Sequence, residues 1–502
     1  MSKPPEKPTI FHNWLSLGAA LFSAAVFSAI LAMIVLDFMV HAPNPYIGII
    51  TYILLPGFLI AGLSLVILGA LLERKRRRKA DPEAVKPFPV MDFNNPVHRR
   101  SFIVATAVGT VFLVFSAFGS YKAFHFTESV TFCGATCHQL MEPEYTAYKH
   151  SSHARVACVQ CHIGPGADWY VRSKLSGAYQ VYSTIFHKYS RPIETPIHNL
   201  RPAQETCEQC HWPEKFFGAI ENDHRYFLSD ENNTPWQTRM LVLVGGGEKK
   251  AGERRGIHWH MNIANEIYYV ATDEKRQVLP WVKKIGPDGK ETIYVDKDSA
   301  FSAENPPPGE LRRMDCIDCH NRPSHNYRSP RDTVNKALAT GEISSSLPYI
   351  KKQSLEVLSK DYKTKEEGLR SIEESIRSFY AKKYPDVLSS HSGEVEKSIE
   401  ALKEIYRVNF FPYMGVSWKE YPENIGHMSS PGCFRCHDGK HESAEGKVIT
   451  NACSTCHVFI AQGPPGTMET SVDGLPFKHP DPDTEDMWKE MSCYECHTGG
   501  PA

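Results

Sequence analysis

Seven short motifs, each a pair of cysteines followed at once by a histidine, constrain this chain more than any other feature of its sequence. Cys-x-x-Cys-His is the attachment signature of c-type haem, in which the thiols bond to the haem vinyl groups and the histidine becomes the proximal iron ligand. The first cysteine pair, Cys133 and Cys137, departs from the signature because three residues separate its cysteines. In the other pairs two residues do: Cys158 and Cys161, Cys207 and Cys210, Cys316 and Cys319, Cys433 and Cys436, Cys453 and Cys456, and Cys493 and Cys496. The histidines that follow them are His138, His162, His211, His320, His437, His457 and His497.

The motifs use all 14 cysteines of the chain, so no thiol remains for a disulfide, a zinc site or a catalytic nucleophile. The alternative is a set of structural zinc knuckles, which the sequence disfavours because every cysteine pair is followed directly by histidine. Since c-type haem is attached outside the cytoplasm, the sequence predicts that the part bearing the motifs is periplasmic and binds seven covalent haems c.

Further histidines could supply the second axial ligand that six-coordinate haem iron takes, which is usually His or Met. The chain has 23 histidines, and 16 of them lie outside the motifs. In residues 256–260 two of these alternate on what we predict to be a strand, which would put both on one side. The candidate distal ligands are His258, His260, His325, His427, His441 and His479.

Three apolar stretches precede the first motif, at residues 11–40, 46–72 and 102–126, and each is long enough to cross a bilayer. The first stretch could instead be a cleaved signal peptide. Its apolar core is longer than that of a signal peptide, however, and it has no convincing cleavage site. The basic run 73–79 indicates a cytoplasmic loop rather than a nucleic-acid patch. The N-terminus is then cytoplasmic and everything after the third span is outside.

The sequence predicts a mainly α membrane-anchored multihaem cytochrome c with loop-rich haem modules. Residues 238–295 alternate apolar and polar positions and predict short antiparallel strands. Residues 331–410 lack cysteine and show apolar residues at helical spacing. The expected parts are a three-span anchor at 1–126 with its basic loop at 73–100, a module for haems 1–3 at 127–237, a β-rich insertion at 238–300, a haem 4 segment at 301–330, a helical insertion at 331–410 and a module for haems 5–7 at 411–502.

The first haem module resembles the NapC/NirT/NrfH family of membrane-anchored quinol dehydrogenases. The resemblance rests on a span followed directly by four motifs, on Tyr145, Tyr148, Lys149 and His153 before the second motif, and on Lys174, twelve residues after His162. Seven motifs behind three spans are most like the ImcH-type inner-membrane cytochromes.

This resemblance implies roles for individual residues. Lys174 would be a distal haem ligand or line a menaquinol pocket, with Tyr179 and Gln180 nearby, although a lysine on a solvated helix is the ordinary alternative. His153 would ligate the fourth haem. Met141 would ligate the first haem, but it follows His138 by three residues where the family has two, so His138 alone is an alternative.

The resemblance also implies a function, which is menaquinol oxidation at the bacterial inner membrane, with electrons passing along the haems to periplasmic c-type cytochromes in anaerobic or extracellular respiration. Homo-oligomer formation is left open. Two alternatives remain: an electron-conduit subunit of a larger complex without its own quinol site, and a multihaem terminal reductase of the nitrite or hydroxylamine type. The reductase is disfavoured because all seven motifs end in histidine and none in lysine.

The motif count makes a direct prediction about haem content. A pyridine-haemochrome assay on the purified protein should give about seven haems c per chain, because each motif attaches one haem covalently. A value near four, or a b-type signal, would contradict this layout.

Overall fold

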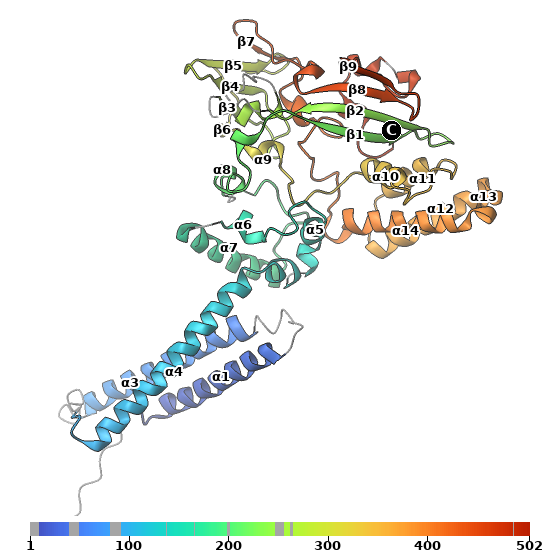
Figure 1. Cartoon of the computed structure of the whole chain (residues 1–502). Helices are drawn as coiled ribbons and strands as arrows, with labels where there is room; N and C mark the ends of the chain where they lie inside the picture. The colour runs from blue at the N-terminus through green and yellow to red at the C-terminus, as the bar shows by residue number, and fades with distance from the viewer. Residues whose placement is uncertain are drawn as a thin grey trace, which may run out of the picture. The chain divides into compact units, whose positions relative to one another are not determined.

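The computed structural model describes residues 10–39, 50–80, 92–136, 138–164, 166–197, 201–245, 256–261, 265–484 and 486–501. The chain divides into two compact units, residues 1–138 and residues 139–502. Each unit has its own architecture (Figure 1).

The first unit consists of long apolar helices. These are α1 (Trp14–Met39), α3 (Leu55–Ala80) and α4 (Pro96–Thr127), with π-helical turns η1 (Ile50–Leu54) and η3 (Thr131–Thr136). All three helices are long and apolar enough to cross a membrane, which confirms the three predicted spans. The described side chains of α4 are not buried within the protein, as expected for a helix that contacts lipid.

Small residues let α1 and α3 approach closely. A Cβ atom at Gly62 would collide with Ser23, and one at Gly69 would collide with Ser16. Ser16 Oγ also donates to the Val66 carbonyl, at 3.0 Å. Small residues and hydroxyl hydrogen bonds replace the hydrophobic effect as the force between helices in a bilayer.

The basic run was predicted to be a loop, and this was wrong. Helix α3 continues through it to Ala80, and Glu73 accepts a 2.7 Å hydrogen bond from Arg77 one turn later. Charges at helical spacing of this kind support the helix beyond its apolar part. Residues 81–91 of the predicted loop lie outside the described residues.

The motifs of the second unit lie on or adjoin short helical turns, each of which carries at least the first cysteine of its motif. These turns are α6 (Cys158–His162), α8 (Ala203–Cys207), α9 (Cys316–Cys319), η7 (Gly432–Arg435), η8 (Cys453–Thr455) and α15 (Cys493–Cys496). Two longer helices belong to the same region, α5 (His138–Lys149) and α7 (Ala167–Ile185).

Two antiparallel sheets are the main β structure of the second unit (Figure 1). One has the order β1-β2-β8-β9, formed by Ala219–Phe227, Pro235–Leu243, His457–Gly463 and Glu469–Leu475. The other has the order β6-β3-β4-β5-β7, formed by Arg312–Arg313, Glu266–Val270, Trp281–Ile285, Glu291–Asp296 and His441–Ser443.

These sheets correct two predictions. The β structure is not confined to residues 238–300, because β1 begins at Ala219 and three strands come from the segment predicted to be loop-rich. Pairing between distant segments, such as Val242 with His457, cannot be read from local alternation. The predicted strand at residues 256–260 is instead the 3₁₀ helix η5 (Ile257–Met261).

The predicted helical segment is present as α10 (Pro330–Ala339), α11 (Ile350–Leu358), α12 (Lys365–Lys383), α13 (Pro385–Ser390) and α14 (Ser392–Asn409). Its apolar positions, among them Ile372, Ile376 and Leu402, are almost fully buried and form the most extensive apolar cluster of the described residues. The two other clusters of buried apolar residues are smaller. Outside this segment, other contacts must therefore hold much of the second unit together.

Membrane topology can be tested with reporter fusions. A reporter that works only outside the cytoplasm should be active when fused at the C-terminal end and inactive when fused within residues 81–91, because the basic stretch keeps that segment inside. Activity in the opposite pattern would overturn the orientation.

Candidate haem sites

Each motif histidine from the second to the seventh lies beside another histidine. The ring-centroid distances are 6.2 Å for His162 and His325, 6.0 Å for His211 and His153, 6.3 Å for His320 and His258, 5.8 Å for His437 and His260, 6.2 Å for His457 and His427, and 6.0 Å for His497 and His479. Because the two rings are about equally far apart at all six sites, the same kind of group would fit between them at each site.

That spacing fits a single metal ion between two imidazoles. An imidazole nitrogen binds a first-row metal at about 2 Å, so two rings on opposite sides of one ion have centroids roughly 6 Å apart. Cysteine pairs stand directly before one histidine of every pair. The residues therefore fit haem iron with two axial histidines, the arrangement that the motifs imply.

Hydrogen bonds orient several of these rings. The Nδ1 atoms of His258, His325 and His437 donate to the carbonyls of Val244, Glu144 and Thr450, at 2.8, 3.0 and 2.8 Å. His153 and His260 make longer bonds of 3.2 Å to the carbonyls of Pro323 and Ile257. A donated Nδ1 proton fixes the tautomer and leaves Nε2 for the metal.

Four of the rings are held in the neutral form that a metal requires. Burial, with a smaller effect from His437, lowers the pKa of His260 to about 4. Burial also lowers the pKa values of His325 and His457 to about 4. Burial and the nearby Arg331 do the same for His497, whose pKa is about 4.

His441 does not fit a haem, and its prediction as a distal ligand was wrong. Its Nδ1 lies 2.9 Å from Asp438 Oδ1 and its Nε2 lies 2.8 Å from the Leu279 carbonyl, so both nitrogens are occupied. Burial opposes the charged ring, but Asp438 and the carbonyl outweigh it and raise the pKa of His441. A ring whose two nitrogens both donate hydrogen bonds has no lone pair for iron.

Two further assignments change. His153 faces His211 of the third motif, not the fourth motif to which the family resemblance assigned it. His258 and His260 do not share one face: on the 3₁₀ helix they turn toward different motif histidines, His320 and His437. A helical turn rotates successive side chains where a strand would return every second one to the same side.

The first motif is only partly described. Cys137 and the side chain of His138 lie outside the described residues. Met141 is half-buried on α5. Its role as the second ligand of a first haem stays a prediction.

Helix α7 carries the residues predicted for quinol chemistry. Lys174 is half-buried, and its Nζ lies 4.8 Å from the centre of the Tyr170 ring. Tyr179 is exposed, and Gln180 Nε2 lies 3.5 Å from Ser176 Oγ. At 3.6 residues per turn, Tyr179 and Gln180 leave the helix on different sides from Lys174, so the helix does not bring the three together.

An apolar stripe runs along α7. The exposed fractions are 54% for Val171, 70% for Leu175, 64% for Tyr179, 42% for Tyr182 and 64% for Ile185. Residues spaced by three or four share a helix face. We call these five residues the α7 stripe; such a surface is one that proteins use against lipid or an apolar partner.

The histidine pairs are interlaced with one another. His325 of the second pair follows His320 of the fourth motif by five residues, and His427 of the sixth pair precedes Cys433 of the fifth motif by six. Cys207 and Cys316, from the third and fourth motifs, lie close together, and the turns α8 and α9 that carry them are in contact. Neighbouring sites are therefore in direct contact through the segments that form them.

Aromatic rings connect the sixth and seventh sites. Ring centroids are 5.0 Å apart for His457 and Phe459, 5.3 Å for Phe459 and Phe477, and 6.4 Å for Phe477 and His479. These contacts complete a continuous series of adjacent sites from the second motif to the seventh.

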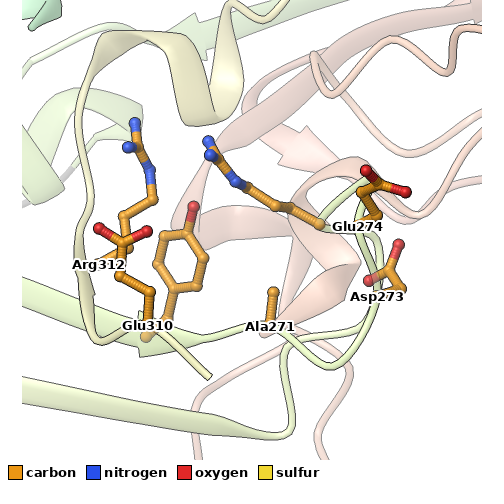
Figure 2. Close-up of a pocket in the computed structure, with 7 residues that line it drawn as sticks. Ala271, Asp273, Glu274, Glu310 and Arg312 are labelled. Atoms are coloured by element: carbon orange, nitrogen blue, oxygen red, sulfur yellow. The ribbon is translucent and has the colours of Figure 1, made fainter. Parts of the chain in front are cut away.

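A charged hollow lies beside the fourth motif, lined by Tyr269, Ala271, Asp273, Glu274, Arg276, Glu310 and Arg312 (Figure 2). The nearby carboxylate of Asp318 accepts hydrogen bonds from the Tyr269 hydroxyl at 2.5 Å and from Arg312 Nε at 3.0 Å. These groups anchor the motif that contains Asp318. We did not predict this anchoring from the sequence. The spacing of Asp315 and Asp318 could have indicated part of it, because it is the spacing of a capping box, which the structure forms.

Residues 95–205 match the model of the NapC/NirT cytochrome c family, N-terminal region. The chain is 44% identical over 485 residues to cytochrome c-type protein ImcH of Geobacter sulfurreducens, covering 97% of this chain and 95% of the relative. It is 29% identical over 119 residues to cytochrome c-type protein NrfH of Wolinella succinogenes, covering 23% of this chain and 64% of the relative. No solved structure matches the chain.

The pairing distinguishes His479 from His441 in an experiment. His479→Ala should convert one of the low-spin ferric haem signals in the electron paramagnetic resonance spectrum to high spin, because one iron loses its second ligand. His441→Ala should leave that spectrum unchanged while lowering the free energy of unfolding by about 1–3 kcal/mol, the effect of leaving buried partners unpaired. A spectral change in His441→Ala would contradict the assignment.

Proposed function

Because the chain belongs to the ImcH-like branch of the NapC/NirT cytochrome c family, we propose that it oxidises menaquinol at the bacterial inner membrane and passes electrons through seven haems c to periplasmic c-type cytochromes. The chain is a membrane-anchored multihaem cytochrome c of electron transport. The haems, when bound, supply the one-electron redox chemistry. The residues supply ligands, spacing and the quinol surface.

The single observation that carries the proposal is the set of six histidine pairs. A terminal reductase needs an iron with an open position for its substrate. Among the described motif histidines from His162 onward, each faces a second histidine, which would fill that position. Six-coordinate iron suits electron transfer, so the geometry favours transfer over substrate reduction.

The order of the sites supports transport along the chain. Each distal histidine comes from a segment that also carries, or adjoins, another site, as His258 and His260 do for the fourth and fifth motifs. Ligands on one short turn keep two irons close together. We infer that the sites follow one another in motif order and that the seventh is the exit to a periplasmic cytochrome.

We place the quinol surface on α7. The α7 stripe is a large apolar surface for a helix outside the three spans. Tyrosines and long basic side chains are typical of the membrane interface, where the ring or stem meets lipid and the polar end meets water. Lys174 lies on this helix, and we propose that its ammonium group donates a hydrogen bond to a quinol oxygen.

One experiment distinguishes this proposal from the alternative in which the chain only conducts electrons within a larger complex. Purified protein mixed with a soluble menaquinol analogue should show reduction of its haem absorbance without any added subunit. If dithionite reduces the haems while the analogue does not, another subunit oxidises the quinol and this chain only conducts electrons.

Lys174→Met tests the quinol surface. We expect the rate of reduction by the analogue to fall about tenfold, which corresponds to the loss of about 1.4 kcal/mol of interaction. Reduction by dithionite should be unchanged because the histidine pairs are intact. Lys382→Met, on the exposed side of α12, is the matched control and should behave as the unaltered protein. If the menaquinol analogue reduces both variants at the same rate, Lys174 has no role in quinol oxidation and is an ordinary helix lysine.

A further inference from the structure

The segment after the seventh motif is fixed to the start of α10. The Arg331 backbone N–H donates to the Gly499 carbonyl at 2.9 Å, and Trp418 Nε1 donates to the Thr498 carbonyl at 3.2 Å. Gly499 has φ +87°, and a Cβ atom there would collide with Ser329 and Trp418. The start of the helical segment therefore forms a wall beside the residues that follow the seventh motif.

Arg331 brings a buried charge to this wall. The residue is 9% exposed. Its Nε and Nη2 donate to Asp332 Oδ1 at 3.2 and 2.9 Å, and Nη2 also donates to Ser429 Oγ at 3.1 Å. Its Nη1 is buried and has no hydrogen-bond partner among the described residues. A buried donor without an acceptor calls for a ligand or another explanation.

A second buried cation stands behind it. Lys351 is 6% exposed, and its Nζ donates to the Phe227 carbonyl. Burial, followed by the charge of Arg331, lowers the pKa of Lys351 to about 8. Both cations act electrostatically on the ring of His497, and Arg331 also acts on Cys493. Two positive charges therefore lie within electrostatic range of the seventh motif, with the carboxylate of Asp332 as the nearest counter-charge.

We propose that Arg331 Nη1 binds a propionate carboxylate of the seventh haem and that Arg331, together with Lys351, raises the reduction potential of that haem. A guanidinium group is the side chain best matched to a carboxylate, since its planar N–H groups fit the two oxygens. Positive charge in a buried site favours the form of the haem that carries the additional electron. Electrons would then collect at the exit end of the series. This inference rests on the seventh haem of the proposed function.

Arg331→Gln tests the role directly, by a redox titration of the full-length protein followed through its haem absorbance. About one-seventh of the absorbance change should move to lower potential, by a tenfold change in the equilibrium constant, or about 59 mV for one electron. Arg370→Gln is the matched control: Arg370 is 72% exposed on α12, and its removal should leave the titration unchanged.

Asp332→Asn gives the opposite sign and remains available if Arg331→Gln does not accumulate. The Asp332 side chain is 48% exposed, so its replacement should be tolerated. Removing its negative charge should move the same fraction to higher potential. An unchanged titration in Arg331→Gln, or in Asp332→Asn where only that variant is obtained, with all haems present by the haemochrome assay, would overturn the inference. Fewer than seven haems in the unaltered protein would instead overturn the cofactor count on which it rests.

Discussion

The structure of the second unit depends on the pairing of each motif histidine from the second to the seventh with a histidine from another part of the chain. A motif supplies two thiols and one histidine from a single turn, but it cannot supply the opposite ligand. That ligand comes from another segment, as when His260 of η5 faces His437. Each such pair brings distant segments side by side, and with haem bound between its rings it would act as a cross-link. The loops between motifs are therefore positioned by coordination as much as by their own packing.

This explains the uneven distribution of apolar packing. The helical segment buries Ile372, Ile376 and Leu402 in a conventional core, while the clusters near the motifs are smaller. Strands β7 to β9 add a second kind of support, because they join the C-terminal motifs to sheets begun much earlier in the chain. The chain has few continuous apolar segments after residue 138. It is stabilised by sheet pairing and by one helical core, and contacts with bound haem would add to these.

Buried polar groups have a related role around the motifs. Asp318 is held by Tyr269 and Arg312, and His441 is held by Asp438 and the Leu279 carbonyl. Such groups are stable in the interior only when hydrogen-bonded, so they fix the backbone that carries the ligands. Arg331 differs because one of its donors is buried without a hydrogen-bond partner in the part of the chain that the structure describes. That difference is the reason for assigning it to a cofactor carboxylate rather than to the support of the fold.

The sequence by itself determined the features whose chemistry is local. Covalent attachment needs two thiols and a histidine within a few residues, a membrane span needs only a long apolar run, and a helix needs apolar residues at its own period. The motifs, the three spans and the helical segment could therefore be predicted. Tertiary structure alone decided which histidines face the motif histidines and which strands pair across the chain. It also decided that His427 faces a motif histidine while both ring nitrogens of His441 are hydrogen-bonded elsewhere. Those outcomes depend on the meeting of distant segments, and a histidine beside a motif is identical in sequence whether its ring nitrogens are free for iron or already bonded to a carboxylate and a carbonyl.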